Sequence, residues 1–555
     1  MNKASKSIIL LLLLGCSASA QKLSSSMKEA LRKLETAVYA ISSLYVDSVD
    51  NNKLTEYAIR GVLSELDPHS VYSDAEETKS ELEPLNAGFD GIGVQFNMLT
   101  DTVYVVQVIA GGPSEKAGLL AGDRIVSVDD TVIAGVKMKT NDVMKRLRGP
   151  RGSKVKLGVW RGNDRLNITV KRGLVPVHSR EACYMVDERT GYIRLSRFSR
   201  TTYDEFAEGI ALLRGRGMQQ LVLDLRFNGG GILDQAVEMA GTFLPEGSTV
   251  LTVRNNRMPR ISERMEATSN NLLPKDLPLV VLVNEFSASA SEILAGAIQD
   301  WDRGVVIGRR TFGKGLVQRP LPFQDGSMIR LTIARYYTPS GRSIQKPYAK
   351  GNFKAYEQEL IGRFKHGESI HSDSIRFPDS LRYKTLVTGR TVYGGGGIMP
   401  DLFIPTDTAL FNKLHRELLN KGIFNRAVLK YVDAHRQKLR QRFPDRQSYA
   451  TFSVPEELTE SLKAFAEAEK ITWSTELFAQ AEELIKCQLH AYIARDILGE
   501  NDFFYFFNRM DKEYIKALDL LNDPDEYKRL LGYHFTSILF RHLNDPDEYK
   551  RLLGK

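Results

Sequence analysis

Between residues 191 and 308 the chain alternates short apolar runs with longer stretches that carry apolar residues at helical spacing, and this alternation most constrains the fold. The runs 221–225 and 279–283 are rich in Leu and Val, which is typical of strands buried on both faces. Strands that alternate with helices favour a parallel sheet. We therefore expect a multidomain α/β protein whose core has a largely parallel sheet. The expected elements are strands at 191–195, 221–225, 279–283 and 305–308, and helices at 203–214, 234–243 and 291–299.

The pattern changes on both sides of this core. With 42% apolar and 26% charged residues, the composition excludes a disordered chain and a polytopic membrane protein. The polar stretch 346–389 is expected to be an exposed insertion in the core. The predicted segments are a signal peptide (1–20), an N-terminal helical region (21–85), a small β-rich domain (86–175), the core (176–409) and a C-terminal helical region (410–555).

The N-terminus is typical of an export signal. Two lysines precede the apolar run 8–14, which is too short to span a bilayer. Residues 18–20 (Ala-Ser-Ala) fit signal-peptidase cleavage, so Gln21 is the expected new N-terminus. An alternative is a bacterial lipoprotein signal with Cys16 as the lipidated residue, for which the preceding residues are a poor match. Membrane association is expected only if Cys16 is lipidated.

The turn after the run 279–283 is a candidate catalytic site. Residues 284–292 include Ser287, Ser289 and Ser291, directly before an expected helix. A hydroxyl there stands at the positive end of the helix dipole beside unsatisfied amides, which suits a nucleophile with an oxyanion intermediate. The serines could equally cap the helix, and spacing alone does not choose among them.

A serine nucleophile needs a base, and no histidine lies near this turn in the sequence. The nine histidines are expected on the surface or in ordinary packing. Lys314 is the nearby candidate, because burial among apolar groups lowers the pKa of a lysine towards neutrality. It could then take the serine proton. The alternative is a solvated loop lysine.

The lysine loop also suggests a nucleotide site, because residues 308–314 match G-x-x-x-x-G-K. However, Gly315 stands where a Ser or Thr would bind magnesium, and residues 316–323 predict a strand rather than a helix. We therefore expect no nucleotide, no cofactor and no metal. The net charge of +8 is spread along the chain, so no nucleic-acid partner is expected.

A third segment, 224–231, follows a buried strand and ends in three glycines, which allow backbone amides to approach a ligand. Together these segments resemble the C-terminal processing peptidases, also called tail-specific proteases, over about residues 60–405. Several motifs occur in that family's order and spacing. The matching residues are Asp224, Leu225, Arg226, Asn228, Gly230, Gly231, 287–292, 311–315, Val317, Gln318, 336–345, Gly397, Ile398, Pro400 and Asp401.

The resemblance implies a serine endopeptidase with a Ser–Lys dyad. It selects Ser289, the middle serine, as nucleophile, Lys314 as general base and Gln318 as the residue that orients the lysine. The insertion and the long helical C-terminus depart from the family. The implied backbone donors to the oxyanion are Ala290 and one of Gly229 or Gly230.

The β-rich unit resembles a PDZ domain, with Gly91, Ile92, Gly93 and Val94 as its carboxylate loop. Such a domain adds a substrate tail as an extra strand, so the implied partners are proteins or peptides with accessible, apolar C-termini. The resemblance also implies work outside the cytoplasm, in a bacterial periplasm or cell envelope. An alternative is a catalytically inactive PDZ scaffold. Whether the chain forms a homo-oligomer stays open.

The C-terminal end contains an internal duplication. Residues 521–532 recur as 543–554, and two copies are too few for a solenoid. The second copy cannot occupy the packing site of the first, so we expect it to contribute little to the fold.

Overall fold

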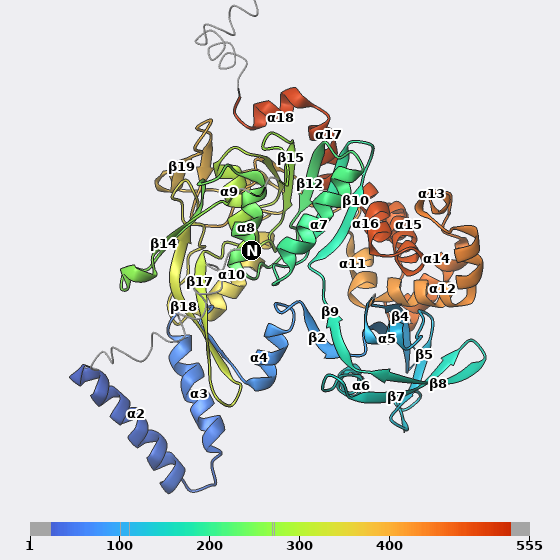
Figure 1. The fold of residues 1–555 in the computed structure, drawn as a ribbon, viewed down its shortest axis with the longest axis horizontal. Helices are drawn as coiled ribbons and strands as arrows, with labels where there is room; N and C mark the ends of the chain where they lie inside the picture. Colours follow the sequence, from blue (N-terminus) through green and yellow to red (C-terminus); the bar gives the residue numbers. More distant parts are fainter. Residues whose placement is uncertain (1–23, 100, 110, 269, 271, 534–555) are drawn as a thin grey trace, which may run out of the picture.

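The computed structural model describes residues 24–99, 101–109, 111–268, 270 and 272–533; the predicted signal peptide, with Cys16, and the second tail copy lie outside this part of the chain. A six-stranded sheet forms the core (Figure 1), in the order β10-β11-β12-β15-β16-β21. The β10–β11 pair is antiparallel and the other pairs are parallel, which confirms the predicted fold class. The strands are β10 (Arg180–Met185), β11 (Thr190–Leu195), β12 (Gln220–Asp224), β15 (Leu279–Val283), β16 (Val305–Gly308) and β21 (Leu402–Phe403).

Both faces of this sheet are buried, which explains its continuously apolar strands. On one face, side chains such as Val281 share a core with residues of α7, α8 and α9. On the other face, the next residue, Leu282, packs with residues of α17 and with Leu531, just beyond α18. The helices are α7 (Thr202–Gly215), α8 (Leu233–Phe243), α9 (Ala290–Asp300), α17 (Lys512–Leu521) and α18 (Pro524–Leu530).

A second, antiparallel sheet ties the N-terminal region to the core. Its order is β1-β18-β13-β14, and β17 also pairs with β18. The strand predicted at 316–323, which argued against a nucleotide-binding helix, is present as β17. The strands are β1 (Val71–Ser73), β13 (Thr249–Arg254), β14 (Glu263–Glu266), β17 (Leu316–Pro322) and β18 (Met328–Tyr337).

The β-rich unit is an antiparallel sheet set apart from the core and joined to it by the ribbon β2–β9 (Figure 1). Asp433 of α12 (Ile423–Arg442), in the C-terminal region, binds Arg124 at 2.5 Å and accepts a hydrogen bond from the hydroxyl of Tyr104. The elements are β2 (Gly88–Gly91), β3 (Val94–Leu99), β4 (Thr102–Val108), α5 (Pro113–Lys116), β5 (Arg124–Val128), β6 (Thr131–Val132), α6 (Thr140–Leu147), β7 (Lys154–Arg161), β8 (Asp164–Lys171) and β9 (Gly173–Pro176).

Helices dominate both ends of the described chain, as predicted. None of the helices in the described ranges is both long and apolar enough to cross a membrane. The N-terminal helices are α2 (Ser25–Leu44), α3 (Asn51–Ser64) and α4 (Ala75–Leu82). The C-terminal ones before α17 are α11 (Lys413–Asn420), α12 (Ile423–Arg442), α13 (Arg446–Tyr449), α14 (Glu456–Ala468), α15 (Thr475–Ile497) and α16 (Glu500–Phe507).

The polar stretch 346–389 is not simply an exposed insertion. Lys346, Tyr356 and Arg363 are at most 6% exposed, so the prediction is wrong for these side chains. They are buried because the helix α10 packs against the loop that holds Lys314, as shown below. The stretch contains α10 (Phe353–Lys365) and β19 (Arg382–Lys384), which pairs with β20 (Thr391–Tyr393).

Candidate active site

Three loops meet at the carboxyl end of the core sheet, which is where ligands bind in open α/β sheets. They are residues 225–231 after β12, 284–289 after β15 and 309–315 after β16. The first two are joined by a backbone hydrogen bond, in which Ala288 N donates to Asn228 O at 3.0 Å. The fold therefore brings together the segments that the sequence marked as catalytic.

The structure distinguishes the three candidate serines. Ser287 and Ser291 are fully buried, and their hydroxyls donate to the carbonyls of Leu225 (2.8 Å) and Asn228 (2.9 Å). Ser289 is half-buried, and its hydroxyl donates to no acceptor among the described residues. It precedes α9 with φ of 55°, a strained conformation for a residue other than glycine and one that clusters at functional sites.

The backbone amides around Ser289 also differ from one another. Gly230 has φ of 93°, and a Cβ on it would lie 2.8 Å from Ser289 Cβ and 2.9 Å from Ala290 N, so glycine is needed for this approach. The Gly230 amide donates to Asn228 Oδ1 at 2.9 Å. Within the described part of the chain, the amides of Gly229 and Ala290 donate to no protein atom. These two amides are therefore available to an oxyanion.

A buried carboxylate, whose role the sequence analysis missed, joins the serine turn to the lysine loop. Glu292 accepts hydrogen bonds from the amides of Ser289 (2.8 Å), Gly313 (2.7 Å) and Lys314 (2.9 Å) and from the hydroxyl of Thr311 (2.6 Å). Burial raises the pKa of Glu292, and the donors oppose that rise. The signal that could have revealed it is the capping-box position, three residues after the N-cap.

Lys314 is half-buried beside this carboxylate. Its Nζ donates to Oε1 of Gln318 at 3.0 Å, so the structure brings these two predicted residues together. Burial, assisted by the Arg330 guanidinium, lowers the pKa of Lys314 from 10.5 to about 8, against the opposing effect of the Glu292 and Asp67 carboxylates. A base with a pKa near the working pH is well suited to accept a proton.

His69 lies beside the candidate site, with its ring packed against Tyr356. Its backbone carbonyl accepts a hydrogen bond from Nε2 of Gln318, 249 positions away. Burial, together with the Lys314 ammonium, lowers the pKa of His69 to about 4, so the imidazole is neutral at pH 7. No local pattern could reveal this contact, because it forms only when the N-terminal turn packs onto the core.

The arginine of the 224–231 segment is also fixed from a distance. The Arg226 guanidinium binds Asp224 at 2.7 Å and both Asp511 and Glu513 at 2.6 Å. Asp511 is the N-cap of α17. The C-terminal region therefore holds the loop that offers the Gly229 amide.

The predicted carboxylate loop lies between β2 and β3. Gly91 pairs with Gly173 in the β2–β9 ribbon, and Gly93 has φ of 79°. In the part of the chain that the structure describes, the amides of Ile92 and Gly93 donate to no protein atom. Val94 packs against the core of its domain.

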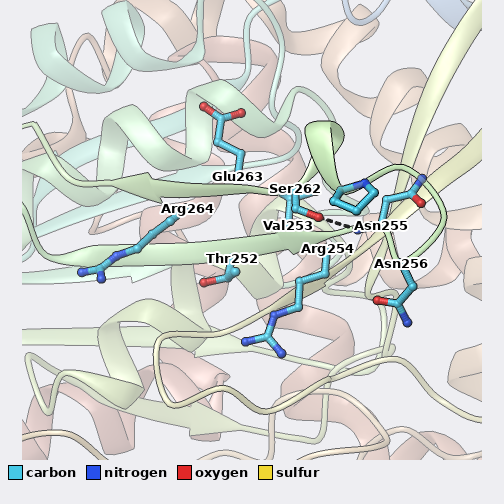
Figure 2. A pocket seen from close by; sticks show the side chains of 9 residues that line it. Thr252, Val253, Arg254, Asn255, Asn256, Ser262, Glu263 and Arg264 are labelled. Atoms are coloured by element: carbon cyan, nitrogen blue, oxygen red, sulfur yellow. Dashed lines mark hydrogen bonds between the residues drawn. The ribbon is translucent and has the colours of Figure 1, made fainter.

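Hollows in the described part of the chain also lie outside the predicted site residues. The one in Figure 2 is formed where β13 turns into β14 through the 3-10 helix η2 (Pro259–Ile261). Its lining residues are Thr252, Val253, Arg254, Asn255, Asn256, Pro259, Ser262, Glu263 and Arg264. A neighbouring hollow shares Arg254 with it and extends to Asp67 and Leu316, close to the lysine loop.

Family models match four segments of the chain. Residues 189–354 match peptidase family S41 and residues 91–171 match a PDZ domain. Residues 14–78 match the N-terminal domain of the activating protease CtpB, and residues 414–499 match a family of unknown function, DUF8443.

Curated relatives agree with this assignment. The carboxy-terminal processing protease CtpA of Bacillus subtilis is 37% identical over 339 residues, which cover 60% of this chain and 71% of that protein. A carboxy-terminal-processing protease of Bartonella bacilliformis is 39% identical over 311 residues, which cover 55% of this chain and 70% of the relative. The solved photosystem II D1 C-terminal processing protease is 32% identical over 58% of this chain and 91% of its own, with a TM-score of 0.33, too low to compare domain arrangements.

A serine with an uncommitted hydroxyl at a strained strand-to-helix turn, joined through Glu292 to the loop of a lysine of lowered pKa, is typical of serine peptidases with a lysine base. The chain belongs to peptidase family S41. It is a carboxy-terminal processing serine peptidase with a PDZ domain, a hydrolase of peptide bonds, as the sequence predicted.

Proposed function

We propose that Ser289 is the nucleophile and Lys314 its general base. Neutral Lys314 takes the Ser289 hydroxyl proton as the oxygen attacks the scissile carbonyl, and the resulting ammonium then protonates the leaving amine. Water hydrolyses the acyl-enzyme by the same proton transfers. Gln318 orients the lysine through its side-chain oxygen. The observation that carries the proposal is the contrast among the serines, since Ser289 alone of the three has an uncommitted hydroxyl proton.

The same geometry supports an oxyanion hole formed by Ala290 and Gly229. Their amides are uncommitted in the described residues, whereas the Gly230 amide already donates to Asn228. Gly230 contributes by its lack of a side chain, which allows the two loops to approach.

We further propose that the enzyme selects proteins by an apolar C-terminal tail. The tail would add to the PDZ sheet, with its carboxylate on the free amides of Ile92 and Gly93 in the Gly91–Val94 loop. The test is turnover by the full-length protein of one peptide with an apolar tail, supplied as the free acid and as the C-terminal amide. Because the amide lacks the charge, kcat/KM should fall about tenfold or more. Equal turnover of the two peptides excludes carboxylate recognition.

Export to a bacterial periplasm or cell envelope is proposed from the signal-like residues 1–20. N-terminal sequencing of the protein from the envelope should give Gln21. A blocked, lipid-modified Cys16 would instead show that the chain is a lipoprotein.

A further inference from the structure

Helix α10 packs directly on the loop that carries the lysine. The Arg363 guanidinium donates to the carbonyls of Thr311 (2.8 Å) and Phe312 (2.9 Å). Lys346 Nζ lies over the rings of Phe312 and Tyr356, at 4.2 and 4.0 Å from their centroids. Most of α10 lies beyond residues 189–354, which match the family S41 model.

Tyr356 connects this helix to the N-terminal turn. Its hydroxyl and Nε2 of His69 lie 2.8 Å apart and share a hydrogen bond. Gln345 Nε2 donates to the same hydroxyl oxygen at 3.3 Å, which leaves the tyrosine proton for the neutral imidazole. The Tyr356 and His69 rings also make an edge-to-face contact, with centroids 5.2 Å apart.

The turn that carries His69 is itself tied to the core. Asp67 Oδ1 accepts hydrogen bonds from the His69 amide (3.0 Å) and the Thr332 hydroxyl (2.8 Å). The Thr332 amide in turn donates to Ser70 Oγ at 3.0 Å. These bonds hold the turn on the side of β18, and the bond between Tyr356 and the His69 ring holds it on the side of α10.

From this turn the contacts lead to the base. The His69 carbonyl accepts a hydrogen bond from Nε2 of Gln318, and Oε1 of Gln318 accepts one from Nζ of Lys314. Three hydrogen bonds thus connect Tyr356 to Lys314. His69 contributes its ring to one bond and its carbonyl to the next, and Gln318 contributes its side-chain nitrogen and then its side-chain oxygen.

We propose that Tyr356 is a positioning residue of the peptidase reaction, which fixes His69 and Gln318 and thereby the direction of the Lys314 amine. This rests on the proposed function, in which Lys314 is the base. Without the Tyr356 hydroxyl the turn that carries His69 loses its hydrogen bond to α10. The His69 carbonyl, which accepts the Gln318 amide, is then held less firmly, and Nζ of Lys314 becomes more mobile and more hydrated.

A more hydrated Lys314 holds its proton more strongly, so the pH profile reports its position. The charged groups that face it are Arg330 on β18, Glu292 on α9 and Asp67 in the N-terminal turn; Arg330 and Lys346 also face His69. Replacing Tyr356 by Phe changes none of these charges. A shift of the profile in that variant therefore reflects the lysine's surroundings rather than a lost neighbour.

The test compares Tyr356→Phe with Tyr348→Phe in the full-length enzyme. Wild type serves as the control for full activity and Ser289→Ala as the control for lost activity. Tyr348 is a matched control. Its ring packs edge-to-face on that of Tyr356, with centroids 6.3 Å apart, but in the described residues its hydroxyl bonds only to Arg335, from which it accepts a hydrogen bond at 3.4 Å. Tyr356→Phe should lower kcat about fivefold to tenfold, leave KM nearly unchanged and move the alkaline rise in activity to higher pH. Tyr348→Phe should match wild type in all three.

A second variant covers the case in which Tyr356→Phe does not fold. His69→Phe keeps a ring beside Tyr356 and removes no charge at pH 7, so it should give the same shift. The double variant should lose no more than either single one, because both break one connection.

Unchanged kcat and pH profile in Tyr356→Phe overturn the proposal, as do additive losses in the double variant. A lower kcat or melting temperature with an unmoved pH profile also overturns it, because that result describes packing alone. Full activity in Ser289→Ala would instead contradict the proposed function.

Discussion

The two sides of Lys314 are built from very different parts of the chain. On one side, Glu292 ties the lysine loop to the Ser289 turn, and all of its partners lie within 22 positions of it. On the other side, Gln318 depends on His69, from 249 positions away, and through it on Tyr356. On the first side, several hydrogen bonds from neighbouring parts of the chain converge on one carboxylate. On the second side, the contacts form a linear series that only the tertiary fold assembles. Effects of substitution should therefore fall off from the first side to the second.

The largest effect is expected at the nucleophile, on the local side. Ser289→Ala removes the attacking oxygen, so turnover of an apolar-tailed peptide should fall by at least about a thousandfold. Ser287→Ala and Ser291→Ala are the matched controls, because each loses only a hydroxyl that donates to a neighbouring carbonyl, and they should keep a good part of the activity. Full activity in Ser289→Ala would remove this serine from the mechanism.

The next effect is expected at the lysine that both sides share. Lys314→Arg keeps the charge but cannot act as a neutral base, so it should be about as inactive as Lys314→Ala. In wild type, activity should rise with pH through about 8, since the neutral form of the lysine increases there. An active arginine variant, or activity that falls across that range, would refute the base role.

Paired substitutions compare the two sides directly. Glu292→Gln places an amide where amide donors converge, which misplaces both loops, and should lower kcat about a hundredfold. Gln318→Leu breaks two hydrogen bonds at the less densely connected side and should cost about tenfold. Steady-state kinetics on both variants show which one loses more kcat, and thermal melts show whether either has lost stability. A larger loss for Gln318→Leu would reverse the comparison.

The smallest effect concerns the duplicated tail. In the first copy, the Tyr527 hydroxyl donates to Leu279 O and accepts from Leu279 N, both at 3.0 Å, so Tyr527→Phe should cost about 1 kcal/mol of stability. Truncation after Gly532, which removes the second copy, should leave the melting temperature and peptide turnover nearly unchanged. A drop of many degrees in the truncated chain would show that the second copy packs into the fold.

Much of the fold was predictable because its signals are local. The apolar run 279–283 is β15 and the strand predicted at 305–308 is β16, with the same bounds in sequence and structure. The helix predicted at 291–299 is α9 with one residue more at each end. Residues neighbouring in sequence determine such periodicity, so a single sequence is sufficient to read it.

The sequence by itself determined the α/β core, the segments that carry the chemistry and, through their resemblance, the peptidase family. It left the choice among three serines to that resemblance, and the choice between Gly229 and Gly230 open. Tertiary structure showed which hydroxyl and which amides are uncommitted, because a group's hydrogen-bond partners are known only once the loops have met. It also decided the roles of His69 and Tyr356, since contacts between residues hundreds of positions apart leave no mark on local periodicity.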